Sequence, residues 1–163
     1  MNRALALVVI VTLVAVDQIS KWATVATMAY GETVPLLPFL SLHHTRNYGI
    51  AFSILDGLGQ WPLVALAAVV LVVVAWLWLQ VPRDRALSHW GFALIVAGAI
   101  GNVIDRVALG YVVDMISFHI DAIDFQFAVF NLADTWITLG ALAVIVDELL
   151  AWRRERAASQ ADT

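Results

Sequence analysis

Long runs of apolar residues alternate along the chain with segments in which polar residues, glycine and proline are frequent. Residues 61–79 contain neither a charge nor an amide side chain. At about 1.5 Å of rise per residue, such a run is long enough to cross a hydrocarbon core of about 30 Å. The pattern predicts four membrane-spanning helices in a single domain. Their predicted bounds are residues 4–28, 61–80, 88–107 and 131–151 of the 1–163 chain.

The connections between these helices differ in character. Residues 30–60 contain helix-breaking glycines and prolines, and residues 33–45 are rich enough in Val, Leu, Phe and Thr to favour short strands. Residues 108–130 are apolar and aromatic with few charges, which is typical of a segment that lies on a bilayer surface. The predicted fold class is an all-α membrane protein of four transmembrane helices, with a small extramembrane β element in the first loop and an interfacial segment in the second.

Composition supports this class and excludes others. Hydrophobic residues make up 62% of the chain and charged residues 13%, whereas soluble domains are usually about 45–50% apolar. The chain has no cysteine, which excludes disulfides, thiol catalysis and thiolate metal sites. The formal charge of −4 and the lack of a long basic run give no reason to expect a nucleic acid partner.

The first apolar run has a competing interpretation, because Arg3 and the residues after it could form a cleavable signal peptide. No clear A-x-A cleavage site follows the run. Asp17 and Lys21 would serve no purpose in a removed segment, and they stand at i and i+4 with the acid first, the favourable order for a pair on one helix face. We therefore expect this run to remain as a membrane helix.

Basic residues predict the orientation of the chain. Arg3, the turn at 83–85 and the tail at 153–156 fall at one end of a four-helix arrangement, and few basic residues fall at the other. By the positive-inside rule, both termini are expected in the cytoplasm. Polar residues at the ends of the predicted helices and in the first loop then gather at the outer side of the membrane. They are Asp17, Lys21, Asn47, Asn102, Asp105, Arg106, Asn131 and Asp134.

Ionisable residues this close to hydrocarbon are expensive and suggest a functional site. A serine–histidine device is poorly supported, because the four histidines lie in loops or at a helix start and no G-x-S-x-G turn is present. A zinc hydrolase motif of the H-E-x-x-H type is also absent, and the adjacent His43 and His44 would point apart in a strand. The remaining candidates are Asp114, after the third predicted helix, and Asp134, in the first turn of the fourth.

Two neighbouring carboxylates cannot both ionise cheaply, so they share a proton and can act together as base and acid. Such a pair can hydrolyse a peptide bond without a metal or a covalent intermediate. Purely structural interpretations of these residues remain open. Asn131 and Asp134 could be only a helix N-cap with an acid in its first turn, residues 102–106 a self-neutralising cluster, and Asp17 with Lys21 a snorkelling ion pair. A small proton- or substrate-linked transporter is the alternative function.

Five ordered motifs make the chain similar to the bacterial lipoprotein signal peptidases, also called type II signal peptidases, over nearly its full length. The motifs are Asp17-Gln-Ile-Ser-Lys21, Asn47-Tyr-Gly-Ile-Ala-Phe52, Gly98-Ala-Ile-Gly-Asn-Val-Ile-Asp-Arg106, Val112-Val-Asp114 and Phe130-Asn-Leu-Ala-Asp134. Two departures concern packing more than chemistry. Ala97 stands where the family usually has a glycine, and Ile50 where a smaller residue is common.

The resemblance implies an aspartic endopeptidase of the bacterial inner membrane that cleaves prolipoproteins just before a diacylglyceryl-modified cysteine, with its site near the periplasmic face. It implies no cofactor and no metal. The implied partners are membrane lipid and lipid-modified precursors, and we expect a monomer. The catalytic aspartates of the family match Asp114 and Asp134. Its supporting polar residues match Asp17, Lys21, Asn47, Gly49, Asn102, Asp105, Arg106 and Asn131. We expect the Asp105–Arg106 pair to hold the end of the third helix in register.

Overall fold

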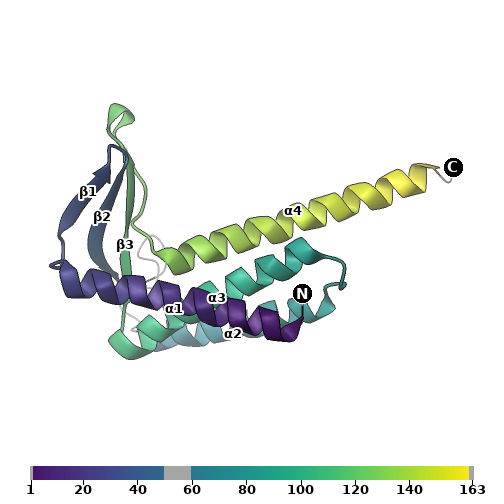
Figure 1. Ribbon diagram of the computed structural model, residues 1–163, viewed down its shortest axis with the longest axis horizontal. Helices are drawn as coiled ribbons and strands as arrows, with labels where there is room; N and C mark the ends of the chain where they lie inside the picture. The colour runs from purple at the N-terminus through teal and green to yellow at the C-terminus, as the bar shows by residue number, and fades with distance from the viewer. Residues whose placement is uncertain (1, 50–59, 162–163) are drawn as a thin grey trace.

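Four long helices run side by side, and a small β-sheet stands across one end of them (Figure 1). This computed structural model describes residues 2–49 and 60–161, so Ile50 and the second half of the first-loop motif lie outside the described residues. The helices are α1 (Arg3–Thr27), α2 (Gln60–Gln80), α3 (Ala86–Leu109) and α4 (Leu132–Ala161). All four are long and apolar enough to cross a membrane, which confirms the predicted fold class. Helix α4 continues beyond its predicted end at residue 151.

The sheet has four antiparallel strands in the order β1-β2-β3-β4. They are β1 (Thr33–Leu37), β2 (Leu40–Asn47), β3 (Val112–Ile120) and β4 (Phe125–Gln126). The first two form the predicted β element of the first loop. The segment predicted to lie on the bilayer surface also contributes strands, β3 and β4. Strand β3 is buried on both faces over most of its length, so its sequence lacks the alternation that identifies a half-exposed strand.

The turn between α3 and β3 sets the position of Asp114. Gly110 ends α3 in the left-handed conformation, with a φ of 81° that favours glycine, and its N–H closes the last turn on the carbonyl of Arg106. The chain enters β3 two residues later. There Asp114 pairs with Thr45, and Val112 with Asn47, in the register between β3 and β2. The short turn therefore places the aspartate at the end of α3 and beside the first loop.

Helices α3 and α4 pack closely because small residues face each other along their contact. A Cβ at Gly98 would collide with the carbonyl oxygen of Ala133, and one at Gly140 would collide with that of Gly91. Ala97, the departure noted in the sequence, is fully buried in α3. Small residues of this kind let membrane helices approach at their backbones. The close approach brings the end of α3 against the start of α4, where the polar residues lie.

The outer surfaces of the helices are apolar. Trp22 on α1, Val72 and Leu79 on α2 and Leu149 on α4 are all largely exposed, as expected for side chains that face hydrocarbon. Buried polar residues concentrate instead at the sheet end of the bundle. A second, smaller group lies at the opposite end, where Asp147 of α4 accepts hydrogen bonds from Ser88 and pairs with Arg85.

Candidate active site

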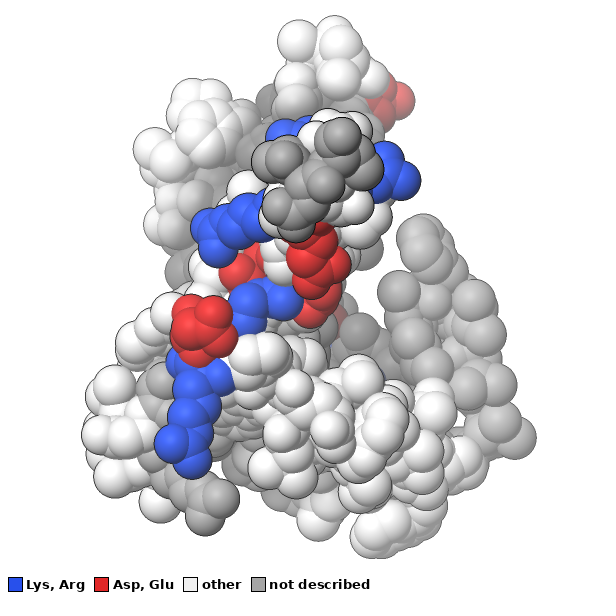
Figure 2. Space-filling model, turned by 90° about the vertical axis from the view of Figure 1, so that its right-hand side faces the viewer, with Lys and Arg blue, Asp and Glu red and all other residues white. Residues whose placement is uncertain are grey.

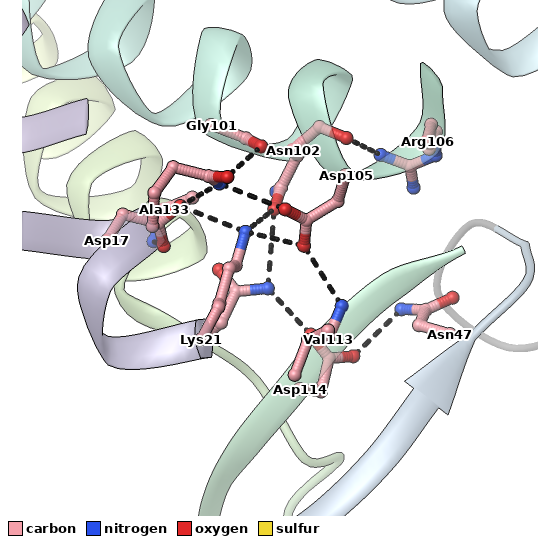
Figure 3. Close-up of polar contacts among 12 residues, drawn as sticks. Asp17, Lys21, Asn47, Gly101, Asn102, Asp105, Arg106, Val113, Asp114 and Ala133 are labelled. Carbon is pink, nitrogen blue, oxygen red and sulfur yellow. Dashed lines mark hydrogen bonds and ion pairs between the residues drawn. The ribbon is translucent and has the colours of Figure 1, made fainter. Parts of the chain in front are cut away.

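The structure brings the predicted polar residues together where α1, α3, α4 and the sheet meet (Figure 3). Most of them are buried although they carry charges or amides. The buried members are Asp17, Lys21, Gly49, Asn102, Asp105, Asp114 and Asn131, while Asn47, Arg106 and Asp134 are partly exposed. Burying so many polar groups costs free energy unless each finds a partner, so the hydrogen bonds of the cluster determine what it can do.

Asp114 is held by two amide side chains that come from different parts of the chain. Its Oδ1 accepts a hydrogen bond from Asn131 Nδ2 at 2.6 Å, and its Oδ2 accepts one from Asn47 Nδ2 at 3.0 Å. Asn47 stays in position because its own Oδ1 accepts from the N–H of Gly49 at 3.1 Å. The carboxyl group of Asp114 is therefore fixed from both sides.

Asp134 lies in the first turn of α4 and takes part in the cap of that helix. Asn131 Oδ1 accepts from the N–H of Asp134 at 3.0 Å, and Asp134 Oδ2 accepts from the N–H of Asn131 at 3.3 Å. This reciprocal arrangement is a capping box, so the N-cap interpretation describes the local geometry. Capping is not the only role of Asn131, because the Nδ2 of the same side chain donates to Asp114. One asparagine thus connects the two aspartates.

Asn102 forms a second connection to Asp134 and is oriented by Lys21. Asn102 Nδ2 donates to Asp134 Oδ1 at 2.7 Å, while its Oδ1 accepts from Lys21 Nζ at 3.0 Å and from Asn131 Nδ2 at 3.3 Å. An ammonium group can only donate. Lys21 therefore requires the oxygen of Asn102 on its side, which directs the amide nitrogen toward Asp134.

Lys21 also makes two ion pairs, one within α1 and one that joins α1 to α3. Its Nζ lies 2.9 Å from Asp17 Oδ2 and 3.1 Å from Asp105 Oδ2, and its side chain is only 3% exposed. The predicted i, i+4 pair is thus present, but the snorkelling interpretation is wrong because the lysine is buried. Asp17 Oδ1 accepts from the backbone N–H of Ala133 at 2.9 Å, and Asp105 Oδ2 from that of Val113 at 3.0 Å. These bonds fix the starts of α4 and β3 relative to α1 and α3.

The prediction that Asp105 pairs with Arg106 is wrong, because Asp105 pairs with Lys21 instead. Arg106 donates from Nη1 to the carbonyl of Asn102 at 3.3 Å and from Nη2 to the carbonyl of Gly49 at 3.1 Å. Consecutive residues of a helix point in different directions, which explains why the two side chains separate. Arg106 therefore connects α3 to the first loop beside Asn47.

Gln18 is a member of the cluster that the sequence analysis did not identify as a site residue. Its Nε2 donates to Asp105 Oδ1 at 2.9 Å, and to Asp17 Oδ2 and the carbonyl of Gly101 at 3.2 Å. An amide next to Asp17 in an otherwise apolar helix was the available signal. Gly101 belongs to the same contact, since a Cβ there would collide with the carboxylate of Asp17.

Burial, together with the neighbouring charge of Asp134, raises the pKa of Asp114 to about 6, against the lowering effect of the hydrogen bonds from Asn47 and Asn131. An isolated aspartate has a pKa near 3.9. The carboxyl group of Asp114 can therefore hold a proton at a pH where an exposed aspartate would be ionised. A pair of linked aspartates with a proton available between them can provide an acid and a base at one place. Among residues 2–49 and 60–161, no group of three or more His, Asp and Glu side chains is arranged to hold a metal ion.

Comparisons with known proteins agree with this arrangement. The sequence profile of a family described as "Signal peptidase (SPase) II" matches residues 9–150. A lipoprotein signal peptidase of Bartonella quintana (strain Toulouse) is 49% identical over 143 residues, covering 88% of this chain and 85% of the relative. One of Sinorhizobium fredii is 47% identical over 152 residues, covering 93% of this chain and 90% of the relative.

A solved bacterial membrane enzyme structure, determined by the in meso method at 2.3 Å resolution, has the same architecture. It superposes with a TM-score of 0.82 at 30% sequence identity, over 90% of this chain and 88% of the other. None of these findings supports the transporter alternative.

Proposed function

The chain belongs to the signal peptidase II family, and from that membership we propose that it cleaves prolipoproteins just before a cysteine that carries a diacylglyceryl group. It is a membrane protease of the aspartic type that removes signal peptides. In our proposal Asp114 and Asp134 are its catalytic residues. The observation that carries this assignment is Asn131, which contacts both carboxyl groups within one network: its side-chain Nδ2 donates to Asp114 and its backbone N–H donates to Asp134.

The two aspartates are assigned different roles. Asp134 stands at the N-terminus of α4, where the helix dipole and the N–H of Asn131 favour a negative charge. Asp114 lies on a strand, and burial together with the charge of Asp134 raises its pKa to about 6. We therefore place the shared proton on Asp114, as the general acid, and make the ionised Asp134 the general base.

The reaction then follows without a covalent intermediate. Asp134 takes a proton from a water molecule whose oxygen attacks the carbonyl carbon of the scissile peptide bond, while Asp114 gives its proton to the carbonyl oxygen. The product of this step is a neutral diol. The proton now on Asp134 moves to the amide nitrogen, the C–N bond breaks, and a diol hydroxyl returns its proton to Asp114. Both carboxyl groups end in their starting states.

The remaining site residues position this pair. Asn47 and Asn131 hold Asp114, and Asn102 holds Asp134. The ion pairs of Lys21 fix the elements that carry the two aspartates, and Arg106 holds the first loop through the carbonyl of Gly49. The network lies where the membrane helices meet the sheet, at the boundary of the bilayer. A lipid-modified precursor can therefore reach it sideways from the bilayer.

An assay with a synthetic lipid-modified precursor peptide and the detergent-purified full chain tests the assignment. We expect Asp114→Asn and Asp134→Asn to fold and to lose cleavage by at least 10³-fold, the scale of losing an essential acid or base. Asp124→Asn is the matched control, because Asp124 is an exposed aspartate in the turn before β4 whose positive φ of 50° an asparagine also tolerates. Cleavage by either site variant at the rate of the control would refute the catalytic pair.

The orientation in the membrane is also part of the proposal. Figure 2 looks at the end of the molecule where α4 ends, and basic and acidic side chains gather there. The basic ones that the chain order places at this end are Arg83, Arg85, Arg153, Arg154 and Arg156. The sheet end has Lys21, Arg46 and Arg106, and Lys21 is neutralised there by its ion pairs. The positive-inside rule supports cytoplasmic termini and a site near the periplasmic face of a bacterial inner membrane. The hydrogen bonds that hold both aspartates are complete within one chain, and we propose a monomer.

A further inference from the structure

Arg46 of β2 lies between two tyrosine rings on the exposed side of the sheet. Its Cζ is 4.8 Å from the ring centre of Tyr30 and 4.8 Å from that of Tyr111. Tyr48 completes the group, since its ring centre lies 5.5 Å from that of Tyr111. We call Tyr30, Arg46, Tyr48 and Tyr111 the arginine–tyrosine cluster. The catalytic proposal assigns no role to any of them.

The cluster keeps the charge of Arg46 available for a ligand. Among the described residues, Arg46 has no carboxylate within ion-pair distance, whereas Arg85 at the other end of the bundle pairs with Asp147 and Glu148. An arginine is a cation at neutral pH, and here it also makes cation–π contacts with the rings of Tyr30 and Tyr111. Its contacts with two rings restrain the guanidinium, and its N–H groups can still donate hydrogen bonds. A restrained, exposed and unneutralised guanidinium is suited to a planar or tetrahedral oxyanion.

The position of the cluster relative to the bundle indicates where that anion would come from. Tyr30 follows the end of α1 at Thr27, and Tyr111 directly follows Gly110 at the end of α3. Two membrane helices therefore end at the level of the cluster. Tyrosine is enriched at this level of membrane proteins, where its ring meets the acyl chains and its hydroxyl meets the headgroups. The phosphate groups of a leaflet lie at the same depth.

The sheet itself has the exposed side chains expected of a surface that lies against headgroups. Its strands run across the direction of the helices (Figure 1), so the sheet extends along the membrane plane. Leu36, Leu37 and Phe39 at the β1–β2 turn are about half exposed, as are Phe125 and Phe127 beyond β3. The Phe39 carbonyl accepts from the N–H of His119, which places the two apolar groups at the same end of the sheet.

We propose that the arginine–tyrosine cluster binds the phosphate of an anionic phospholipid, such as phosphatidylglycerol, in the leaflet on the sheet side. Arg46 donates to the phosphate oxygens, and the hydroxyls of the exposed Tyr30 and Tyr48 add further hydrogen bonds. This lipid is chemically distinct from the proposed substrate, because a diacylglyceryl-cysteine has no phosphate. The site is adjacent to the catalytic network, since Asn47, which holds Asp114, is the next residue of β2. The inference depends only on membrane insertion, so it stands or falls separately from the catalytic assignment.

Thermal unfolding of the full chain in a neutral detergent, with added lipid, tests this site. A ligand that binds only the folded protein raises its melting temperature with lipid concentration. We expect phosphatidylglycerol to raise it more than phosphatidylcholine does, and Arg46→Gln to weaken the apparent affinity for phosphatidylglycerol roughly tenfold, as expected for losing a charged hydrogen-bond donor. Arg46→Lys keeps the charge but loses the planar donor edge, so its affinity for phosphatidylglycerol should lie between those of the wild type and Arg46→Gln.

Arg156→Gln is the matched control. Arg156 also stacks on an aromatic ring, 3.9 Å from the centre of Trp152, but at the opposite end of the molecule. The lipid-dependent rise should persist in this variant. An equal loss in both arginine variants, or none in Arg46→Gln, would overturn the proposal. If inorganic phosphate or glycerol phosphate at the same concentration reproduces the whole rise, the cluster is a site for free phosphate and the lipid assignment is wrong. Should Arg46→Gln fail to fold, Arg46→Lys and Tyr30→Leu decide by the same lipid-dependent increment.

Discussion

Asn131 Nδ2 lies 2.6 Å from Asp114 Oδ1, although the oxygen of the same side chain caps helix α4. The two roles use opposite ends of one amide group. The cap fixes the start of the helix that carries Asp134, and the donor end fixes the other aspartate. Capping and the proposed chemistry are therefore coupled through a single residue, and a substitution can separate them.

Asn131→Ser is expected to separate the two roles. Serine is an equally good N-cap but has no second donor that could reach Asp114. Its free energy of unfolding should stay within about 1 kcal/mol of the wild type, whereas cleavage falls at least tenfold because a charge-assisted hydrogen bond is lost. Asn131→Ala, which loses both roles, should be destabilised by a further 1 kcal/mol or so. Unchanged cleavage in Asn131→Ser would show that the bond to Asp114 has no catalytic role.

The pH dependence of cleavage should report the proton on Asp114. If that residue is the general acid, kcat/KM falls as pH rises above about 6, where Asp114 loses its proton. The decline should approach tenfold per pH unit well above that value. A profile of kcat/KM measured with the purified enzyme from pH 5 to pH 9 checks this expectation. A rate that stays constant over this range would place the proton elsewhere.

Stability should change with pH for the same reason and with a definite sign. The pKa of Asp114 is about 6 in the folded protein and near 3.9 in the unfolded chain, so the folded state binds the proton more tightly. The contribution of this group is therefore most favourable below pH 4 and is lost as pH rises through 6, by about 3 kcal/mol in total. Denaturation of the wild type and of Asp114→Asn at several pH values measures it. The two proteins should have the same pH slope above pH 7. If their free energies of unfolding instead differ by the same amount at every pH from 4 to 7, the expectation is contradicted.

Lys21 should matter chiefly for stability, because it is the one cation in direct contact with two buried carboxylates among the described residues. Lys21→Met leaves Asp17 and Asp105 uncompensated, and we expect a loss of about 3–5 kcal/mol in the free energy of unfolding. In the wild type, Lys21, Asp17 and Asp105 together carry a net charge of −1. The double variant Lys21→Met/Asp105→Asn restores this value. It should recover part of the loss. If the double variant is no more stable than the single one, the ion pairs do not account for the effect.

The sequence predicted the membrane helices well and the partners within the site only partly, for physical reasons. An uncharged run long enough to cross a bilayer identifies a helix from its own residues. The pair of Asp17 and Lys21 is likewise local, because i and i+4 always lie on one helix face. That Asp105 joins this pair depends on how α1 packs against α3, which no local pattern encodes. The expected bond between Asp105 and Arg106 failed because adjacent helix positions diverge.

The sheet illustrates the same limit. Strands β1 and β2 follow from glycine, proline and β-branched residues in the first loop, whereas β3 is covered on both faces and has no alternating pattern. Its pairing with β2 joins segments that are far apart in the sequence, and this pairing places Asp114 beside Asn47. The position of the proposed acid is thus a consequence of tertiary structure.

Close packing of α3 against α4 leads to a prediction about position along one interface. Gly98→Ala would push against the carbonyl of Ala133, next to Asp134, and Gly140→Ala would push against the carbonyl of Gly91 far from the site. Both variants should be destabilised by about 1–3 kcal/mol from overpacking. Cleavage measured at a temperature where both remain folded should fall much more in Gly98→Ala, since the Asn102–Asp134 bond spans the two helices there. Equal activities would argue that the spacing at that point is not critical.

The proposed orientation can be tested directly because the chain contains no cysteine. Gln126 of β4 and Ser159 near the end of α4 are exposed and lie at opposite ends of the molecule. In spheroplasts, a membrane-impermeant maleimide should label Gln126→Cys at once and Ser159→Cys only after lysis, because the basic residues near Ser159 hold that end in the cytoplasm. Retained cleavage of a precursor by both variants confirms that each is correctly inserted. The reverse labelling order would place the aspartate pair on the cytoplasmic side and contradict the proposed site of lipoprotein processing.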